Sequence, residues 1–128
     1  MRTLIVEDDF LSRKLMLAYL SPLSECDIAA SGTEAIEAFM MANDAGKYYD
    51  LIMLDIMMPE ISGQEVLKRI RRIEEEQGLT AAKIIMTTAL TDADNIMTAF
   101  KNQCEGYLVK PIDSEKLRGL LRELNLLV

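Results

Sequence analysis

Short apolar runs alternate along this chain with longer stretches of mixed polarity. Runs of Leu, Ile, Val and Met occupy residues 3–6, 51–54 and 84–86, and polar or turn residues follow each of them. Two weaker runs, at residues 27–30 and 107–109, have the length and flanking residues of strands but alternate poorly. Continuous apolar runs of this length are typical of parallel strands that are buried on both faces. The pattern therefore predicts five strands.

The stretches between these runs have the three-and-four residue spacing of amphipathic helices. Two helices are expected over residues 11–20 and 34–45. Three more are indicated by apolar stripes around Ile70, Ile96 and Leu120. Capping-box patterns stand at three of the expected helix starts: Ser31-x-x-Glu34, Ser62-x-x-Glu65 and Thr91-x-x-Asp94.

Five strands that alternate with five helices predict a single α/β domain. The alternation implies a doubly wound parallel sheet with helices on both faces, because each parallel crossover is right-handed and long enough to contain a helix. The length of 128 residues suits one domain, which is expected to span residues 1–128 with no output domain. Ligands of such sheets bind outside the carboxyl ends of the strands, so the functional site is expected there.

The charge balance and the missing residue types narrow the chemistry. With 14 Lys and Arg against 21 Asp and Glu, the net charge of −7 argues against nucleic acid or an anionic membrane as a direct partner. No apolar run approaches the roughly 18 residues of a membrane span and no signal peptide is evident, so a cytoplasmic protein is expected. The chain has no histidine, which excludes a Ser-His-Asp triad and His-ligated zinc.

Carboxylates, hydroxyls and one ammonium follow four of the predicted strands: Glu7, Asp8 and Asp9, then Asp55, then Thr87 and Thr88, then Lys110. Carboxylates about 4 Å apart repel by roughly 4 kcal/mol per pair at an effective dielectric constant near 20, so such a group binds either protons or a cation. An all-oxygen site suits Mg²⁺, which phosphate oxygens commonly complete. Lys110 adds a positive charge for the same kind of ligand. The cluster therefore favours a phosphoryl group.

Four segments of the sequence resemble the receiver domain of response regulators, the CheY-like family of two-component signalling. They are Leu4-Ile5-Val6-Glu7-Asp8-Asp9, residues 51–59 with Gly63, Thr88-Ala89, and Tyr107-Leu108-Val109-Lys110-Pro111. Each segment alone is weak evidence, but four of them in this order, at predicted strand ends, are a strong indication. The resemblance covers essentially the whole chain and implies the flavodoxin-like strand order 2-1-3-4-5.

The resemblance also implies a phosphoacceptor and a metal site. Asp55 would accept a phosphoryl group from a phosphohistidine on a partner sensor histidine kinase or phosphotransfer protein. Asp9 would ligate Mg²⁺ or Mn²⁺ directly and Asp8 mainly through water. Asp55 itself and the backbone carbonyl of Met57 would complete the protein ligands.

A conformational switch is implied by the same resemblance. Lys110 and the Thr88 hydroxyl would hold the phosphoryl oxygens, while Thr88 and Tyr107 would rearrange and alter a partner-binding surface. Such a domain catalyses only its own phosphorylation and dephosphorylation and is a signalling domain, not an enzyme. Its downstream effector would be an unidentified protein, and it would be a monomer or a homodimer linked to phosphorylation.

Several positions leave alternatives open. For Glu7, a solvated place at the rim is favoured over a role as metal ligand. The basic run at residues 68–72 is expected to be a solvated helix face, with Glu65 and Arg69 paired, and not a nucleic-acid patch. The apolar Met57 and Leu90 beside the site suggest the hypothesis of slow spontaneous dephosphorylation.

The main rival function is a haloacid-dehalogenase-like phosphohydrolase with Asp55 as its nucleophile. That class needs a second aspartate two residues further on, where this chain has Met57, so the usual acid–base group is absent. A nucleotide or flavin carrier is a second rival, but the scattered glycines form no G-x-G or P-loop motif. Neither rival explains the Lys110-Pro111 pair.

Overall fold

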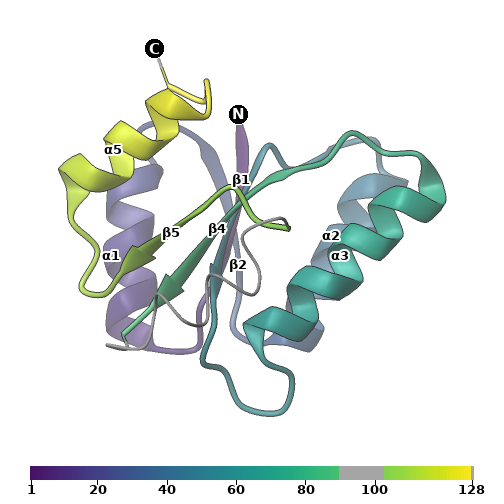
Figure 1. The fold of residues 1–128 in the computed structure, drawn as a ribbon, viewed down its shortest axis with the longest axis horizontal. Helices are drawn as coiled ribbons and strands as arrows, with labels where there is room; N and C mark the ends of the chain where they lie inside the picture. The colour runs from purple at the N-terminus through teal and green to yellow at the C-terminus, as the bar shows by residue number, and fades with distance from the viewer. Residues whose placement is uncertain (90–102, 128) are drawn as a thin grey trace.

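A parallel five-stranded sheet forms the centre of the structure, a computed structural model that describes residues 1–89 and 103–127 (Figure 1). Its strands are β1 (Arg2–Val6), β2 (Glu25–Ala29), β3 (Leu51–Asp55), β4 (Lys83–Thr88) and β5 (Gly106–Val109). Their order across the sheet is β2-β1-β3-β4-β5, and every neighbouring pair is parallel. The predicted fold class and the implied strand order are confirmed.

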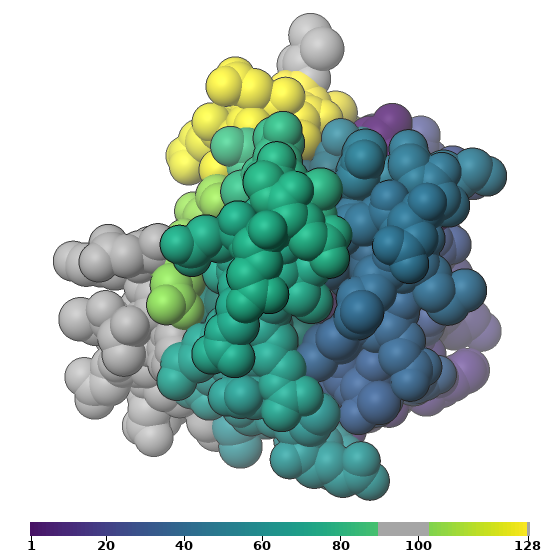
Figure 2. Space-filling view, turned by 90° about the vertical axis from the view of Figure 1, so that its right-hand side faces the viewer, coloured from purple at the N-terminus to yellow at the C-terminus, as the bar shows by residue number. Residues whose placement is uncertain are grey.

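Four helices within the described residues cover the sheet: α1 (Phe10–Leu20), α2 (Gly32–Asp44), α3 (Gly63–Gln77) and α5 (Ser114–Glu123). Figure 1 shows α1 and α5 on one face of the sheet and α2 and α3 on the other, and Figure 2 shows α2 beside α3 from outside. The fifth helix, expected around Ile96, falls outside the described residues, as do Leu90 and the Thr91-x-x-Asp94 pattern. None of the described helices is both long and apolar enough to cross a membrane.

Apolar layers on both faces of the sheet explain the continuous apolar runs of the strands. On β1, Leu4 packs into the layer under α2 and α3, whereas Ile5 packs into the layer under α1 and α5. The same alternation sends Met53 of β3 and Ile85 of β4 to the layer under α1 and α5. The pleat of each strand therefore decides on which face the polar side chain at its end lies.

Polar caps start the helices soon after the strands. The Ser31 hydroxyl accepts a hydrogen bond from the Glu34 backbone N–H at 3.2 Å, and the Ser62 hydroxyl accepts one from Glu65 at 3.3 Å. Asp113 caps α5 in the same way. These caps satisfy backbone donors that would otherwise lack partners, and they confirm the predicted starts of α2 and α3.

The edge strand β2 begins earlier than predicted. It runs over Glu25–Ala29, where the apolar pattern indicated residues 27–30. Only Ala29 is buried in this strand, so its apolar signal is weak. The Glu25 backbone N–H nevertheless donates to the Met1 carbonyl at 3.0 Å, which extends the pairing with β1. Backbone pairing, and not side-chain polarity, sets this boundary.

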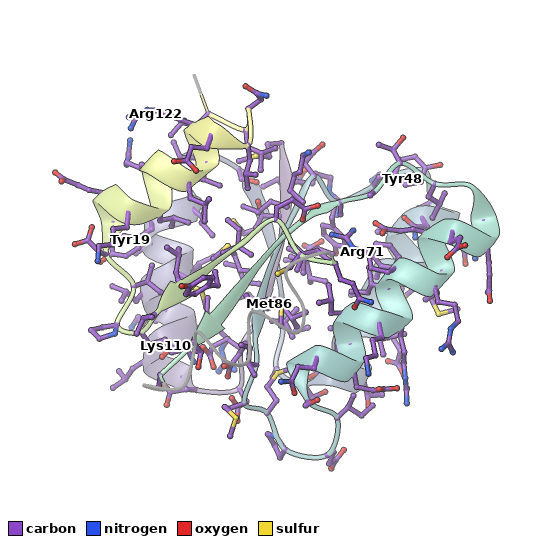
Figure 3. All side chains as sticks on the ribbon, in the orientation of Figure 1. Tyr19, Tyr48, Arg71, Met86, Lys110 and Arg122 are labelled. Carbon is purple, nitrogen blue, oxygen red and sulfur yellow. The ribbon has the colours of Figure 1, made fainter. Side chains whose placement is uncertain are left out.

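Arg71 in the basic run of α3 is not solvated, contrary to the expectation for residues 68–72. Its guanidinium donates to the Glu74 carboxylate at 2.8 Å, to the Ala82 carbonyl at 2.9 Å and to Glu105 at 3.0 Å. The expected pair of Arg69 with Glu65 is confirmed at 3.2 Å. Arg71 therefore ties α3 to the segments that precede β4 and β5, because it lies on the side of α3 that faces the sheet (Figure 3).

Candidate functional site

The carboxyl ends of the strands meet at one edge of the sheet, opposite the end where both chain termini lie (Figure 1). Glu7 follows β1, Asp55 ends β3, Thr88 ends β4, and Lys110 follows β5. The ladder continues past the strand ends, since the Lys110 backbone N–H donates to the Thr88 carbonyl at 2.7 Å. Side chains from four separate parts of the sequence are thus held on one rigid edge.

A cluster of carboxylates lies at this edge. Glu7, Asp8 and Asp55 each offer a carboxylate oxygen, and these oxygens all lie within 4.8 Å of one another. Glu7 is fully buried and Asp55 is 3% exposed, whereas Asp8 is open to solvent. Three hard oxygen donors with one open side are the donor set that Mg²⁺ and Mn²⁺ prefer, so the residues present fit such an ion.

Lys110 neutralises part of this charge. Its ammonium lies 3.3 Å from the Asp55 carboxylate and also pairs with Glu7. The side chain is 15% exposed and lies at the carboxyl end of β5 (Figure 3). Burial works to lower the pKa of Lys110, but the Glu7 hydrogen bond and the Asp55 charge outweigh it, so the pKa lies above its ordinary value. Lys110 therefore stays a cation inside the site.

The surroundings of Asp55 disfavour the ionised form of its carboxyl. Burial raises the pKa of the Asp55 carboxyl to about 7, and the hydrogen bond and negative charge of Glu7 add to the rise. The Lys110 ammonium and the Met57 backbone N–H, which donates to Asp55 at 3.2 Å, act in the opposite direction. A bound cation would favour the ionised, nucleophilic form of this carboxyl.

Glu7, and not Asp9, belongs to the cluster of three carboxylates, and the predicted role of Asp9 as a metal ligand stays a prediction. The solvated position expected for Glu7 is wrong, because this side chain is fully buried and pairs with Lys110. Asp9 lies outside the cluster and caps α1 instead, accepting from the Ser12 backbone N–H at 2.9 Å. The Ser12 hydrogen bonds hold the pKa of the exposed Asp9 carboxyl below its ordinary value.

The different positions of Glu7 and Asp9 depend on where β1 ends and α1 begins. The Glu7 backbone N–H still pairs with the Ala29 carbonyl at 3.1 Å, so its side chain keeps the pleat of β1 and points to the site. Because α1 begins at Phe10, Asp9 is used as its N-cap. The preference of Asp for the N-cap position is a signal that could have separated Asp9 from the metal ligands.

The loop after β3 holds Asp55 in place. A Cβ atom at Gly63 would lie 2.1 Å from the Asp55 backbone oxygen, so only glycine permits this close approach. The Gly63 backbone N–H donates to the Ile56 carbonyl at 3.0 Å. The Met57 side chain is 58% exposed. The role of the Met57 carbonyl as a metal ligand stays a prediction.

Thr88 and Tyr107 occupy the positions from which a switch would act. Thr88 is fully buried at the end of β4 and lies in register with Val109. Tyr107 is 39% exposed and lies in register with Met86, which packs into the layer under α2 and α3. Thr88 thus pairs with β5 at Val109, two residues after Tyr107.

Known proteins match nearly the whole chain. Residues 3–122 match the family described as the response regulator receiver domain. The chain is 37% identical over 123 residues to the probable transcriptional regulator ycf29 of Porphyra purpurea, covering 94% of this chain and 54% of that protein. It is 35% identical over 126 residues to the transcriptional regulatory protein ResD of Bacillus subtilis, covering 94% of this chain and 48% of that protein. The chain spans about half the length of these curated relatives.

Solved structures share the fold. The response regulator protein TrrA from Thermotoga maritima, in complex with Mg²⁺-BeF, has a TM-score of 0.77 at 33% identity, covering 96% of this chain and 97% of that chain. A mutant of the receiver domain of the histidine kinase CKI1 from Arabidopsis thaliana has a TM-score of 0.81 at 26% identity, covering 97% of this chain and 89% of that chain. The phosphohydrolase alternative finds no support in these matches.

Proposed function

Because the chain belongs to the family of response regulator receiver domains, we propose that it is a two-component signalling switch that accepts a phosphoryl group on Asp55. The observation that carries this proposal is the geometry around Asp55. A buried carboxyl at a strand end has the Lys110 ammonium 3.3 Å away and two further carboxylates within 4.8 Å. The donor is a sensor histidine kinase or a phosphotransfer protein.

Each site residue has a separate role in phosphoryl transfer. An oxygen of Asp55 attacks the phosphorus of a phosphohistidine, an O–P bond forms as the N–P bond breaks, and the imidazole leaves and takes up a proton. Lys110 stabilises the negative charge on the phosphoryl oxygens. Glu7, Asp8 and Asp55, with the Met57 carbonyl, would hold Mg²⁺ or Mn²⁺, and the ion would neutralise the same charge. The TrrA structure with Mg²⁺-BeF supports this arrangement.

Phosphorylation then changes a protein-binding surface. The Thr88 hydroxyl takes one phosphoryl oxygen, Tyr107 follows, and the surface around β5 and α5 is altered. Charge-assisted hydrogen bonds of about 1.5–3 kcal/mol each supply the roughly 5.5 kcal/mol needed to reverse a 99 to 1 preference. The effector is a protein, the switch acts in the cytoplasm, and self-catalysis is limited to gain and loss of the phosphoryl group.

Labelling with radioactive acetyl phosphate tests the proposal. We expect the parent protein to take up label in Mg²⁺, to lose most of it in EDTA, and to lose it completely as Asp55→Asn. Asp44→Asn, a change of an exposed aspartate in α2, is the matched control and should label like the parent. Label retained by Asp55→Asn would reject the acceptor, and rapid phosphate release from many small esters would favour a phosphohydrolase.

A further inference from the structure

A buried hydroxyl beside the site has no hydrogen-bond partner. Thr87 is fully buried, and among the described residues its Oγ1 has no hydrogen-bond partner. A buried hydroxyl without a partner destabilises the folded state, and such groups are uncommon in native proteins. The phosphoryl contact proposed above belongs to Thr88, so the function leaves Thr87 without a role.

The register places Thr87 on the same face of the sheet as the acceptor. Thr87 is the partner of Asp55 across β3 and β4 and of Leu108 across β4 and β5. The Ile56 backbone N–H donates to the Thr87 carbonyl at 2.9 Å, so the pairing is intact at this point. Residues paired across parallel strands point to the same face, so Thr87 and Asp55 are neighbours on the α1–α5 side.

The Lys110 side chain reaches from the end of β5 to carboxylates on β3 and after β1. Lys110 follows β5, yet its ammonium pairs with Asp55 of β3 and with Glu7 beyond β1. The strand order places β4 between β5 and β3. Since neighbouring strands lie about 4.8 Å apart, the lysine stem must span the width of β4, the strand on which Thr87 lies.

Metal binding and Lys110 compete for the same carboxylates. Glu7 and Asp55 are both partners of the ammonium, and both belong to the three-carboxylate cluster. Two cations in one cluster repel each other, so a divalent cation bound to these carboxylates weakens their hold on the ammonium. The displaced ammonium, 15% exposed, then needs another acceptor inside the protein.

We propose that the Thr87 hydroxyl is the alternative hydrogen-bond acceptor for the Lys110 ammonium when Glu7 and Asp55 bind a divalent cation. This inference rests on the proposed function and adds a positioning residue to its site. From β4 the ammonium still faces the acceptor carboxyl on the adjoining strand, where the phosphoryl oxygens arrive. Thr87 thus lets the metal bind without sending Lys110 out of the site.

Magnesium titration of hydroxyl variants tests the inference without any phosphoryl donor. Isothermal titration calorimetry is carried out on the full chain as parent, Thr87→Val and Thr87→Ser. Thr87→Val keeps the shape and removes the hydroxyl, and we expect its Mg²⁺ affinity to fall about tenfold, the usual effect of one lost hydrogen bond to a charged group. Thr87→Ser keeps the hydroxyl and should bind Mg²⁺ close to the parent.

Thermal unfolding in EDTA separates this role from packing. Thr87→Val should melt at or above the temperature of the parent, because the removed hydroxyl has no partner in the metal-free protein. Thr3→Val is the matched control: Thr3 is equally buried on β1, but its hydroxyl lies 2.7 Å from the Ser24 hydroxyl. It should melt below the parent and bind Mg²⁺ with parental affinity.

Three outcomes would overturn the inference. They are a parental Mg²⁺ affinity for Thr87→Val, an equal loss of affinity for Thr87→Ser, and a lower melting temperature of Thr87→Val in EDTA. Failure of the proposed function looks different. A parent that binds Mg²⁺ but takes no label from acetyl phosphate would reject the acceptor role of Asp55, and the titration would still decide the role of Thr87.

Discussion

At the scale of single residues, the site is a balance of buried charges. Glu7 and Asp55 are carboxylates with almost no exposed surface, and both rely on the Lys110 ammonium. Burial, followed by the hydrogen bond and negative charge of Glu7, raises the pKa of Asp55 to about 7, and the Lys110 ammonium offsets only part of this rise. The divalent cation proposed for this site would supply further positive charge to the cluster.

The free energy of unfolding of the metal-free protein is expected to fall as the pH rises from about 4 to about 8. The pKa of Asp55 is about 7 in the folded protein, against an ordinary value of 3.8. Between these values the folded chain holds a proton that the unfolded chain has lost, so raising the pH favours unfolding, by on the order of 2 kcal/mol. Urea unfolding in EDTA at both pH values measures the effect. Asp55→Asn should remove most of this slope, and a parallel slope in that variant would contradict the assignment.

At the scale of elements, the turn between β1 and α1 decides which acids face the metal. Glu7 still belongs to the ladder of β1, Asp8 reaches the cluster, and Asp9 caps α1. A single turn thus places one of two adjacent aspartates in the carboxylate cluster and uses the other as a helix cap. The sequence resemblance, which pointed to Asp8 and Asp9, is one residue out of step with this geometry.

Conservative changes at the two aspartates check this assignment. Asp8→Asn should lower the Mg²⁺ affinity at least tenfold, because it removes a charged oxygen ligand. Asp9→Asn should leave both the affinity and the stability near the parent, since Asn caps a helix as well as Asp does. Calorimetric titration and urea unfolding of both variants give the comparison. A larger affinity loss in Asp9→Asn than in Asp8→Asn would restore the original expectation.

The Arg71 network is the second feature of this scale, and it holds α3 against the amino ends of β4 and β5. Arg71→Met should lower the free energy of unfolding by about 3 kcal/mol, because it leaves the buried Glu74 and the partly buried Glu105 without their cation. Arg69→Met is the matched control on the same helix, and its exposed pair with Glu65 should cost less than about 1 kcal/mol. Urea unfolding measures both, and equal losses would mean that the network adds nothing.

At the scale of the whole molecule, the site depends on the complete fold. Its side chains come from β1, β3, β4 and the end of β5, and they meet only when the parallel order β1-β3-β4-β5 is formed. The unfolded chain has no such site. Binding at the cluster is therefore coupled to the stability of the entire domain.

Magnesium is accordingly expected to stabilise the protein against unfolding. At a free concentration about 100 times the dissociation constant, the gain should be about 2.7 kcal/mol for one site that exists only in the folded state. Unfolding curves at rising MgCl₂, with NaCl at matched ionic strength as reference, measure it. Glu7→Gln should reduce the gain. An equal gain in Glu7→Gln and the parent would place the ion elsewhere.

Much of the fold could be predicted from the sequence, because its signals are local. The apolar runs of β1, β3 and β4 and the caps Ser31 and Ser62 depend on neighbours a few residues away. The strand ends predicted that Asp55 and Lys110 lie together, and the resemblance to receiver domains gave Asp55 its role as candidate acceptor; the structure brings the two side chains within 3.3 Å. The cytoplasmic location, the dimer and the slow dephosphorylation stay predictions.

The sequence by itself determined the parallel α/β architecture and the gathering of acids, hydroxyls and a lysine at one edge, since periodicity and strand ends can be found in a linear chain. Only the tertiary structure decided that Glu7 is buried while Asp9 caps a helix, that Arg71 is an anchor, and that Thr87 is paired with Asp55 across β3 and β4. These outcomes depend on which face of a pleated strand a side chain takes and on which strands become neighbours. Neither the strand face that a side chain takes nor the neighbouring strands can be predicted from the order of polar residues along the chain.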